Sequence, residues 1–176
     1  MFNPTKMLFV TALALTIPLS TWAGGGPEMP PYKGSVELER LKSLAGTWKG
    51  KEDMGQGVQD VVATYAVTAN GSAVIETLFP KTPHEMVSVY HDENGKLSMT
   101  HYCMLGNQPH MKLKDSGPTS IALVMHGKEG ITNANEPHMH SLMIKFVDAD
   151  TIEHLWTHHK DGKPSNTVTF RLTRSK

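Results

Sequence analysis

The hydrophobic and polar residues alternate with a period of two over most of the chain after Gly46. This period is typical of β-strands that bury one face, and turn-forming pairs such as Asn-Gly and Asp-Gly separate the alternating runs. After a first strand that starts at Gly46, the runs cover residues 58–68, 73–79, 86–91, 97–104, 109–114, 119–126, 138–147, 151–159 and 166–173. About ten strands without a second helical pattern predict an all-β fold, an antiparallel barrel or sandwich.

One short helix is predicted before the strands. Ser35 is a residue type that caps helix N-termini, and two glutamates in the first turn suit the helix dipole. Leu38, Leu41 and Leu44 follow at helical spacing and give one apolar face. Gly46 is placed to end the helix and to lead directly into the first strand.

The N-terminus predicts export. Lys6 and the apolar run Met7–Leu19, followed by small residues at the positions that a signal peptidase reads, indicate a signal peptide over 1–23. A run this short does not favour a membrane span, so none is expected in the mature chain. Residues 24–34 are rich in Gly and Pro and predict a flexible linker, which leaves one barrel domain over 35–176. We expect a periplasmic or extracellular location.

Charge and cysteine content narrow the range of partners. The chain has 17 basic and 17 acidic side chains and no basic stripe, so nucleic acid is not an expected partner. Cys103 is the single cysteine, which excludes an internal disulfide. Its simplest interpretation is a small buried hydrophobic residue.

The hairpin over residues 86–104 predicts which side chains enter the interior. A three-residue loop at 93–95 would put Val87 and Val89 on the same face as the more apolar set of the second strand. That inward set is Leu97, Met99, His101 and Cys103. Ser88 and Tyr102 would then look outward.

Two later strands show the same distribution, with apolar side chains toward one end and histidines toward the other. On one strand the shared face holds His138, His140, Leu142, Ile144 and Phe146, and on the next it holds Ile152, His154, Trp156 and His158. A packed floor with a polar pocket above it can hold one small molecule. The predicted residues for binding an apolar or amphipathic ligand are Met99, His101, Cys103, His140, His154 and Trp156.

Other functions use the same residues. A metal site would draw on His101, Cys103, His138, His140 and His154, a set that suits zinc, with nearby methionines favouring copper. Haem could be held by His101 or His140, but without a Cys-x-x-Cys-His motif it would not be covalently attached.

A small hydrolase or isomerase could use a histidine base and Cys103 as nucleophile. No Gly-x-Ser-x-Gly, phosphate-loop or His-Glu-x-x-His motif occurs, so no catalytic residue is assigned. A filled barrel that serves as an interaction module is the remaining class.

Three segments carry a resemblance to a known group. These are Gly46-Thr-Trp48 on the first strand, the arginines of TFRLTR at Arg171 and Arg174, and the HLWTHHKDGK run near the end. With one helix before about ten meandering strands, residues 36–174 resemble the calycin superfamily, and within it the bacterial lipocalin-like secreted proteins of unknown function. The resemblance implies a lipocalin-like barrel in which Arg171 or Arg174 packs over Trp48 at the closed end.

Overall fold

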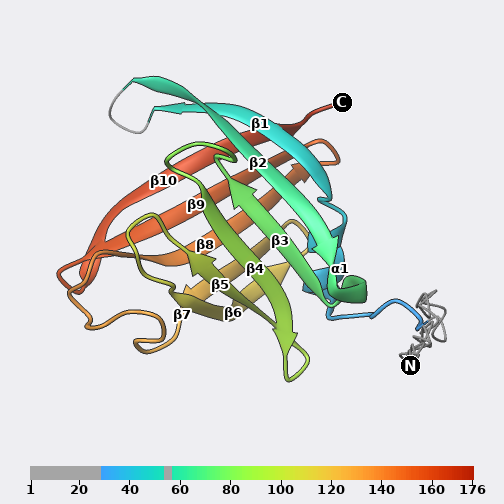
Figure 1. Cartoon of the computed structure of the whole chain (residues 1–176), viewed down its shortest axis with the longest axis horizontal. Coiled ribbons are helices and arrows are strands. Elements are labelled where there is room, and N and C mark those ends of the chain that lie inside the picture. Colours follow the sequence, from blue (N-terminus) through green and yellow to red (C-terminus); the bar gives the residue numbers. More distant parts are fainter. Residues whose placement is uncertain (1–28, 54–56) are drawn as a thin grey trace, which may run out of the picture.

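The alternating segments form ten antiparallel strands that close into one barrel, in the order β1-β10-β9-β8-β7-β6-β5-β4-β3-β2 (Figure 1). The computed structural model describes residues 29–53 and 57–176, so the predicted signal peptide lies outside the described residues. The strands are β1 (Gly46–Asp53), β2 (Val58–Thr68), β3 (Ala73–Leu78), β4 (Met86–Glu93), β5 (Lys96–Tyr102), β6 (His110–Gly117), β7 (Ser120–Met125), β8 (His138–Asp148), β9 (Thr151–Lys160) and β10 (Lys163–Arg174). The predicted all-β barrel is confirmed.

One helix, α1 (Val36–Lys42), covers one end of the barrel. The Ser35 hydroxyl caps it by accepting a hydrogen bond from the Leu38 amide at 3.2 Å. The Asp92 carboxylate at the end of β4 in turn accepts from the amide and hydroxyl of Ser35, at 2.6 and 2.7 Å. Leu38 and Leu41 are fully buried. The helix ends at Lys42, before the predicted end at Gly46, where β1 already begins.

The end of the predicted linker is held against the barrel. The Tyr32 amide donates to the carbonyl of Asn70, in the 3₁₀ turn η1 (Ala69–Gly71), at 2.8 Å. The Lys42 ammonium donates to the Tyr32 carbonyl at 2.8 Å. The part of the linker that the structure describes is therefore docked near α1 and is not a free tether.

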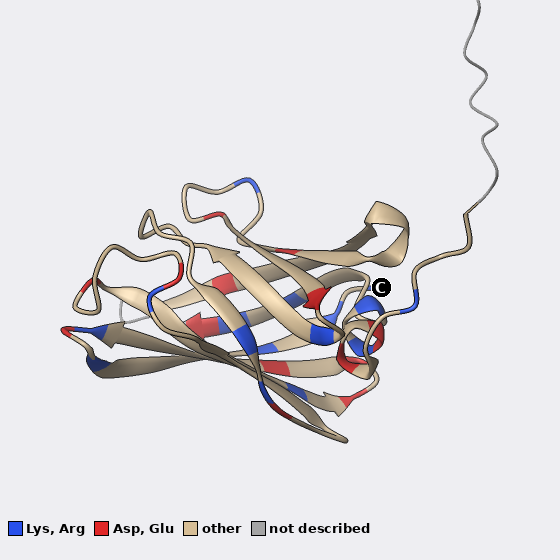
Figure 2. Cartoon of the chain, turned by 90° about the horizontal axis from the view of Figure 1, so that it is seen from below, with Lys and Arg blue, Asp and Glu red and all other residues tan. Residues whose placement is uncertain are grey.

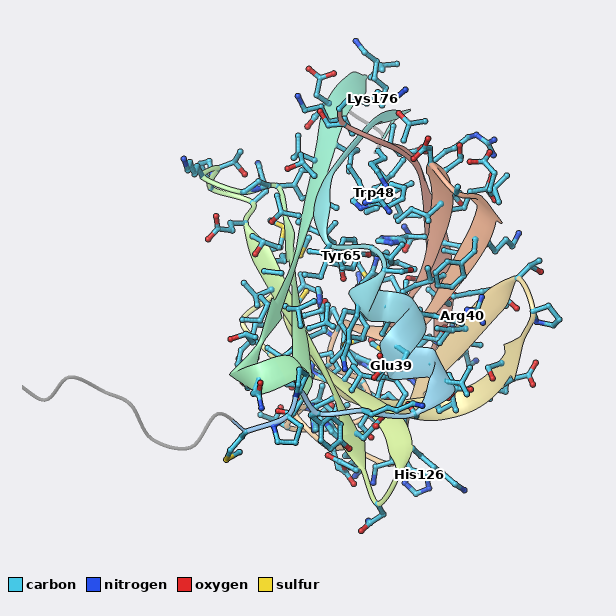
Figure 3. The ribbon with its side chains drawn as sticks, turned by 90° about the vertical axis from the view of Figure 1, so that its right-hand side faces the viewer. Glu39, Arg40, Trp48, Tyr65, His126 and Lys176 are labelled. Atoms are coloured by element: carbon cyan, nitrogen blue, oxygen red, sulfur yellow. The ribbon has the colours of Figure 1, made fainter. Side chains whose placement is uncertain are left out.

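Trp48 forms the floor beside α1, as the resemblance implied. Its side chain is fully buried, and its Nε1 donates to the Leu44 carbonyl at 2.7 Å. Of the two candidate arginines it is Arg174 that packs over the ring, with its guanidinium carbon 4.3 Å from the ring centroid. Arg171 pairs instead with Glu153. Figure 3 looks onto this end, with Trp48 above α1 in the view. The closed ten-strand barrel is consistent with a calycin-like fold.

Positions of Lys or Arg and positions of Asp or Glu are interspersed along the strands in the view of Figure 2. In the described part of the chain, no helix has the length and apolar content that crossing a membrane requires.

In the β4–β5 hairpin, the predicted inward face of β4 is wrong. Glu93 pairs with Lys96, so the turn holds two residues rather than three. Asn94 and Gly95 both have positive φ, at 52° and 76°, as a type I′ turn requires. The prediction for β5 is right, because Leu97, Met99, His101 and Cys103 are all buried. The shorter turn shifts β4 by one residue, so Ser88 and Tyr90 face inward where Val87 and Val89 were expected.

A β-bulge in β8 makes a second predicted face wrong, the one shared by the histidines and the apolar residues of this strand. Met139 pairs with His158 on β9, and both side chains face the barrel interior. The next residue of β8 in register is Ser141, which makes His140 an extra residue in the ladder. A bulge shifts the alternation by one position. Leu142 beyond it points inward, whereas the histidines at the start of β8 lie on the outer face, contrary to the predicted shared face.

Candidate functional site

A cavity of about 270 Å³ opens at the end of the barrel opposite α1. The ends of β3, β5 and β9 meet there with the starts of β4, β8 and β10, because neighbouring strands run in opposite directions. The wall is mainly apolar, and it includes Leu78, Phe79, Met86, Met139, Val168 and Phe170. Met104 and Leu105, in the loop after β5, are about half exposed and form an apolar rim. An open apolar cavity is the usual setting for a small ligand.

His101 and Trp156 provide polar atoms in this wall. Their ring centroids lie 4.5 Å apart, and the side chains are 1% and 2% exposed. His101 Nδ1 is 3.0 Å from the Ser88 hydroxyl. Neither His101 Nε2 nor Trp156 Nε1 has a hydrogen-bond partner among the described residues. Buried polar atoms are nearly always paired, so these two unpaired nitrogens, in side chains that line the cavity, stand out.

Burial decides the charge of two titratable groups that line the cavity, His101 near the end of β5 and Cys103 just after it. It lowers the pKa of His101 to about 4, so the imidazole is neutral at pH 7. It also raises the pKa of the Cys103 thiol, which therefore keeps its proton. A protonated thiol is a weak nucleophile, and an imidazole with so low a pKa is a weak base.

A second polar group is buried deeper in the barrel, outside the cavity wall. The Glu76 carboxylate accepts hydrogen bonds from the hydroxyls of Tyr65 at 3.1 Å and Tyr90 at 2.6 Å. His154 Nε2 lies 2.8 Å from the Tyr65 hydroxyl, and its Nδ1 lies 3.3 Å from Glu76 Oε1. Burial, and then the charge of Glu76, raise the pKa of both tyrosines well above its usual value. Their hydroxyls thus stay protonated and solvate the buried carboxylate.

Three histidines meet on the outer face of β8 and β9. His138 Nε2 lies 3.2 Å from His140 Nδ1, and the rings of His140 and His159 stack with centroids 3.7 Å apart. One nitrogen of each ring lies within 4.8 Å of the others. Burial and the neighbouring histidines lower the pKa of His140 to about 4. His138, at the start of β8, is buried, while His140 and His159 are partly exposed.

A second surface group lies on β4 and β6. Glu93 Oε1 is 3.2 Å from His91 Nε2 and 3.1 Å from His110 Nε2. Glu129, in the β7–β8 loop, approaches His110 at 4.0 Å. Each imidazole already has a carboxylate neighbour, so this His–Glu cluster is a useful comparison for the three histidines.

The structure divides the predicted site residues among three places. His101, Cys103 and Trp156 line the cavity. Met99 and His154 are fully buried, but they belong to the core rather than to the cavity wall. The other predicted residues, His138 and His140, are on the outer face. The five predicted metal ligands therefore do not converge, and of the two imidazoles considered for haem only His101 faces the cavity.

His159 was missed as a partner of the outer histidines. In β9 it pairs directly with His138. Counting back from the turn between β8 and β9 does not reveal this pair, because irregularities after Met139 and Phe146 each add a residue to β8. The two adjacent histidines at the end of β9 were the available signal, since on a strand one of them must face outward.

No model of a known protein family matches the chain, and no curated protein matches it. Function is therefore inferred from the geometry of the cavity and of the three outer histidines.

Proposed function

We propose that this protein binds one small, neutral, apolar or amphipathic molecule in the barrel cavity. The observation that carries the proposal is an open cavity with apolar walls in which His101 Nε2 and Trp156 Nε1 have no partner among the described residues. An apolar wall supplies affinity, and a few converging polar atoms supply orientation.

The lining indicates the chemistry of the ligand. No Asp, Glu, Lys or Arg is among the described residues that line the cavity, which favours a neutral ligand. An indole N–H only donates, so Trp156 calls for an acceptor such as a carbonyl or hydroxyl oxygen. About 270 Å³ is at the lower end for ligand pockets, which favours a small molecule.

Titration with the neutral fluorophore N-phenyl-1-naphthylamine tests whether the cavity binds an apolar molecule. We expect saturable binding with one site per chain and enhanced emission. Val168→Phe places a larger side chain in the cavity wall and should abolish it. Val67→Phe, at a position that is 43% exposed on β2, is the matched control and should leave binding unchanged. Non-saturable binding, or equal binding by both variants, would overturn the proposal.

The polar contact is tested with a pair of competitors of similar shape, 2-acetylnaphthalene and 2-ethylnaphthalene. The ketone should displace the fluorophore at lower concentration, because its oxygen can accept from Trp156 Nε1. Trp156→Phe keeps an aromatic ring but removes the donor. It should lower the preference for the ketone by about fivefold, the effect of one neutral hydrogen bond. An unchanged preference would show that Trp156 does not contact the ligand.

We also propose that the protein is exported and is a lipocalin-like member of the calycin superfamily. Export is supported by Lys6 and the apolar run Met7–Leu19. The superfamily is supported by the barrel closed at one end by α1, with Arg174 over Trp48. Cell fractionation and the mass of the purified protein test export. A mature chain that begins at Gly24 is expected, and an uncleaved chain retained in the cytoplasm would contradict it.

A further inference from the structure

We infer that His138, His140 and His159 form a binding site for one divalent transition-metal ion of the zinc or copper class. This site is separate from the ligand cavity and uses the outer face of the barrel. One imidazole nitrogen from each residue lies within 4.8 Å of the others. Imidazole is a preferred ligand of both ions, and three histidines with one open position are a known zinc arrangement.

One of the nitrogen–nitrogen distances already matches what an ion requires, and the third histidine lies within reach. Two nitrogens bound to one tetrahedral zinc ion are about 3.3 Å apart, given zinc–nitrogen bonds of about 2.0–2.1 Å. His138 Nε2 and His140 Nδ1 are already 3.2 Å apart. The rings of His140 and His159 are stacked, with 8° between their planes. Because an ion binds near the plane of each ring, one of them must rotate, which their partial exposure allows.

The tautomer of His138 is set for binding. Its Nδ1 lies 2.7 Å from the Glu136 carbonyl oxygen. A carbonyl oxygen only accepts, so Nδ1 carries the proton and Nε2 presents its lone pair toward His140. Metal-binding histidines usually have such a partner on the second nitrogen, which fixes the orientation of the ring.

The segment that supplies this carbonyl is itself held in place. The Glu136 carboxylate accepts from Asn107 Nδ2 at 2.8 Å and from the Thr132 amide at 2.7 Å. Asn107 also donates to the Pro137 carbonyl at 2.8 Å. The β7–β8 loop is thus tied to the β5–β6 loop immediately before His138, and the buried imidazole is oriented without the ion.

The bulge gives the site its shape. His138 pairs with His159 across β8 and β9, and the extra residue in β8 is His140. Bulges re-aim side chains near functional sites. Here the bulge brings the His140 ring against the His159 ring on the outer face. In the described residues no fourth His, Cys, Asp or Glu joins the three, so water would complete the coordination.

Calorimetric titration of the untagged protein with Zn²⁺ at pH 7.5 tests this site. We expect one ion per chain with a Kd in the micromolar range or below. His140→Gln and His159→Gln should each weaken binding at least tenfold. His126→Gln, at an exposed position in the β7–β8 loop, and His110→Gln, in the other surface cluster, should change it less than twofold. Absence of saturable binding, or a larger loss in His110→Gln, would overturn the assignment.

A thermal melt provides a second readout that does not depend on heats of binding. Zn²⁺ at a hundredfold excess over Kd should raise the Tm of the parent protein and of His126→Gln by about 5 °C or more. It should not raise the Tm of His159→Gln, whose far-UV spectrum should match that of the parent protein. Equal stabilisation of all three would mean that the ion binds elsewhere. Naphthylamine binding is measured without metal, so its failure and the failure of this site are separate results.

Discussion

The buried His101 predicts a specific loss of stability in acid. Its pKa is about 4 in the folded protein and 6.5 as the ordinary value, so between these pH values the unfolded chain binds a proton that the folded chain does not. The stability from this group is therefore complete at neutral pH and decreases as the pH falls. From pH 7 to pH 5 the expected loss is about 2 kcal/mol in the free energy of unfolding.

Urea denaturation of the parent protein and of His101→Gln, at pH 7 and at pH 5, measures this loss. The variant cannot take up the proton, so its stability should fall by about 2 kcal/mol less over the same interval. Other histidines with a lowered pKa, such as His154, contribute to both proteins and cancel in the comparison. The exposed His126→Gln should behave like the parent protein. If His101→Gln and the parent protein lose equal amounts, His101 is not held neutral by burial.

Two further predictions concern the stability of the barrel. Glu76→Ala leaves the hydroxyls of Tyr65 and Tyr90 without their acceptor and should lower the free energy of unfolding by about 3–5 kcal/mol in urea denaturation. Glu76→Gln keeps one acceptor and should lose less. A loss below about 1 kcal/mol for the alanine variant would contradict the described network. Gly50→Ala places a methyl carbon 2.1 Å from the Arg171 carbonyl oxygen, so β1 and β10 must separate, at a cost of about 2 kcal/mol or more. Gly117→Ala meets only an ordinary contact at 3.9 Å, and equal Tm values for these two glycine variants would refute the steric argument.

The fold could be predicted because its signals are local. The period of two, the turn residues and the Ser35 cap each depend on a few adjacent residues, and the structure places α1 and the ten strands near the predicted ranges. The inward direction of His101 and Cys103 could also be read, since β5 is regular from Leu97 onward.

The composition of the sites could not be predicted in full, because it depends on which of the two alternating sets of side chains in each strand faces inward. A turn of two residues instead of three reversed β4, and one extra residue at His140 reversed the start of β8. Each change places the side chains on one side of it on the opposite face from the one predicted. A sequence of alternating residues does not mark where a bulge falls. The predicted set was therefore divided, with His138 and His140 outside the barrel and His101 inside.

Arg174, which packs over Trp48, also joins the two ends of the barrel sequence, because it donates to the Ala45 carbonyl 129 residues earlier. Contacts between such distant positions slow folding, since a long segment must be ordered before they form. Until β10 docks, β1 and β9 each have an open edge that can pair with another chain. Closure of the ring removes both open edges at once, and a change in the emission of Trp48 beneath Arg174 is expected to accompany it.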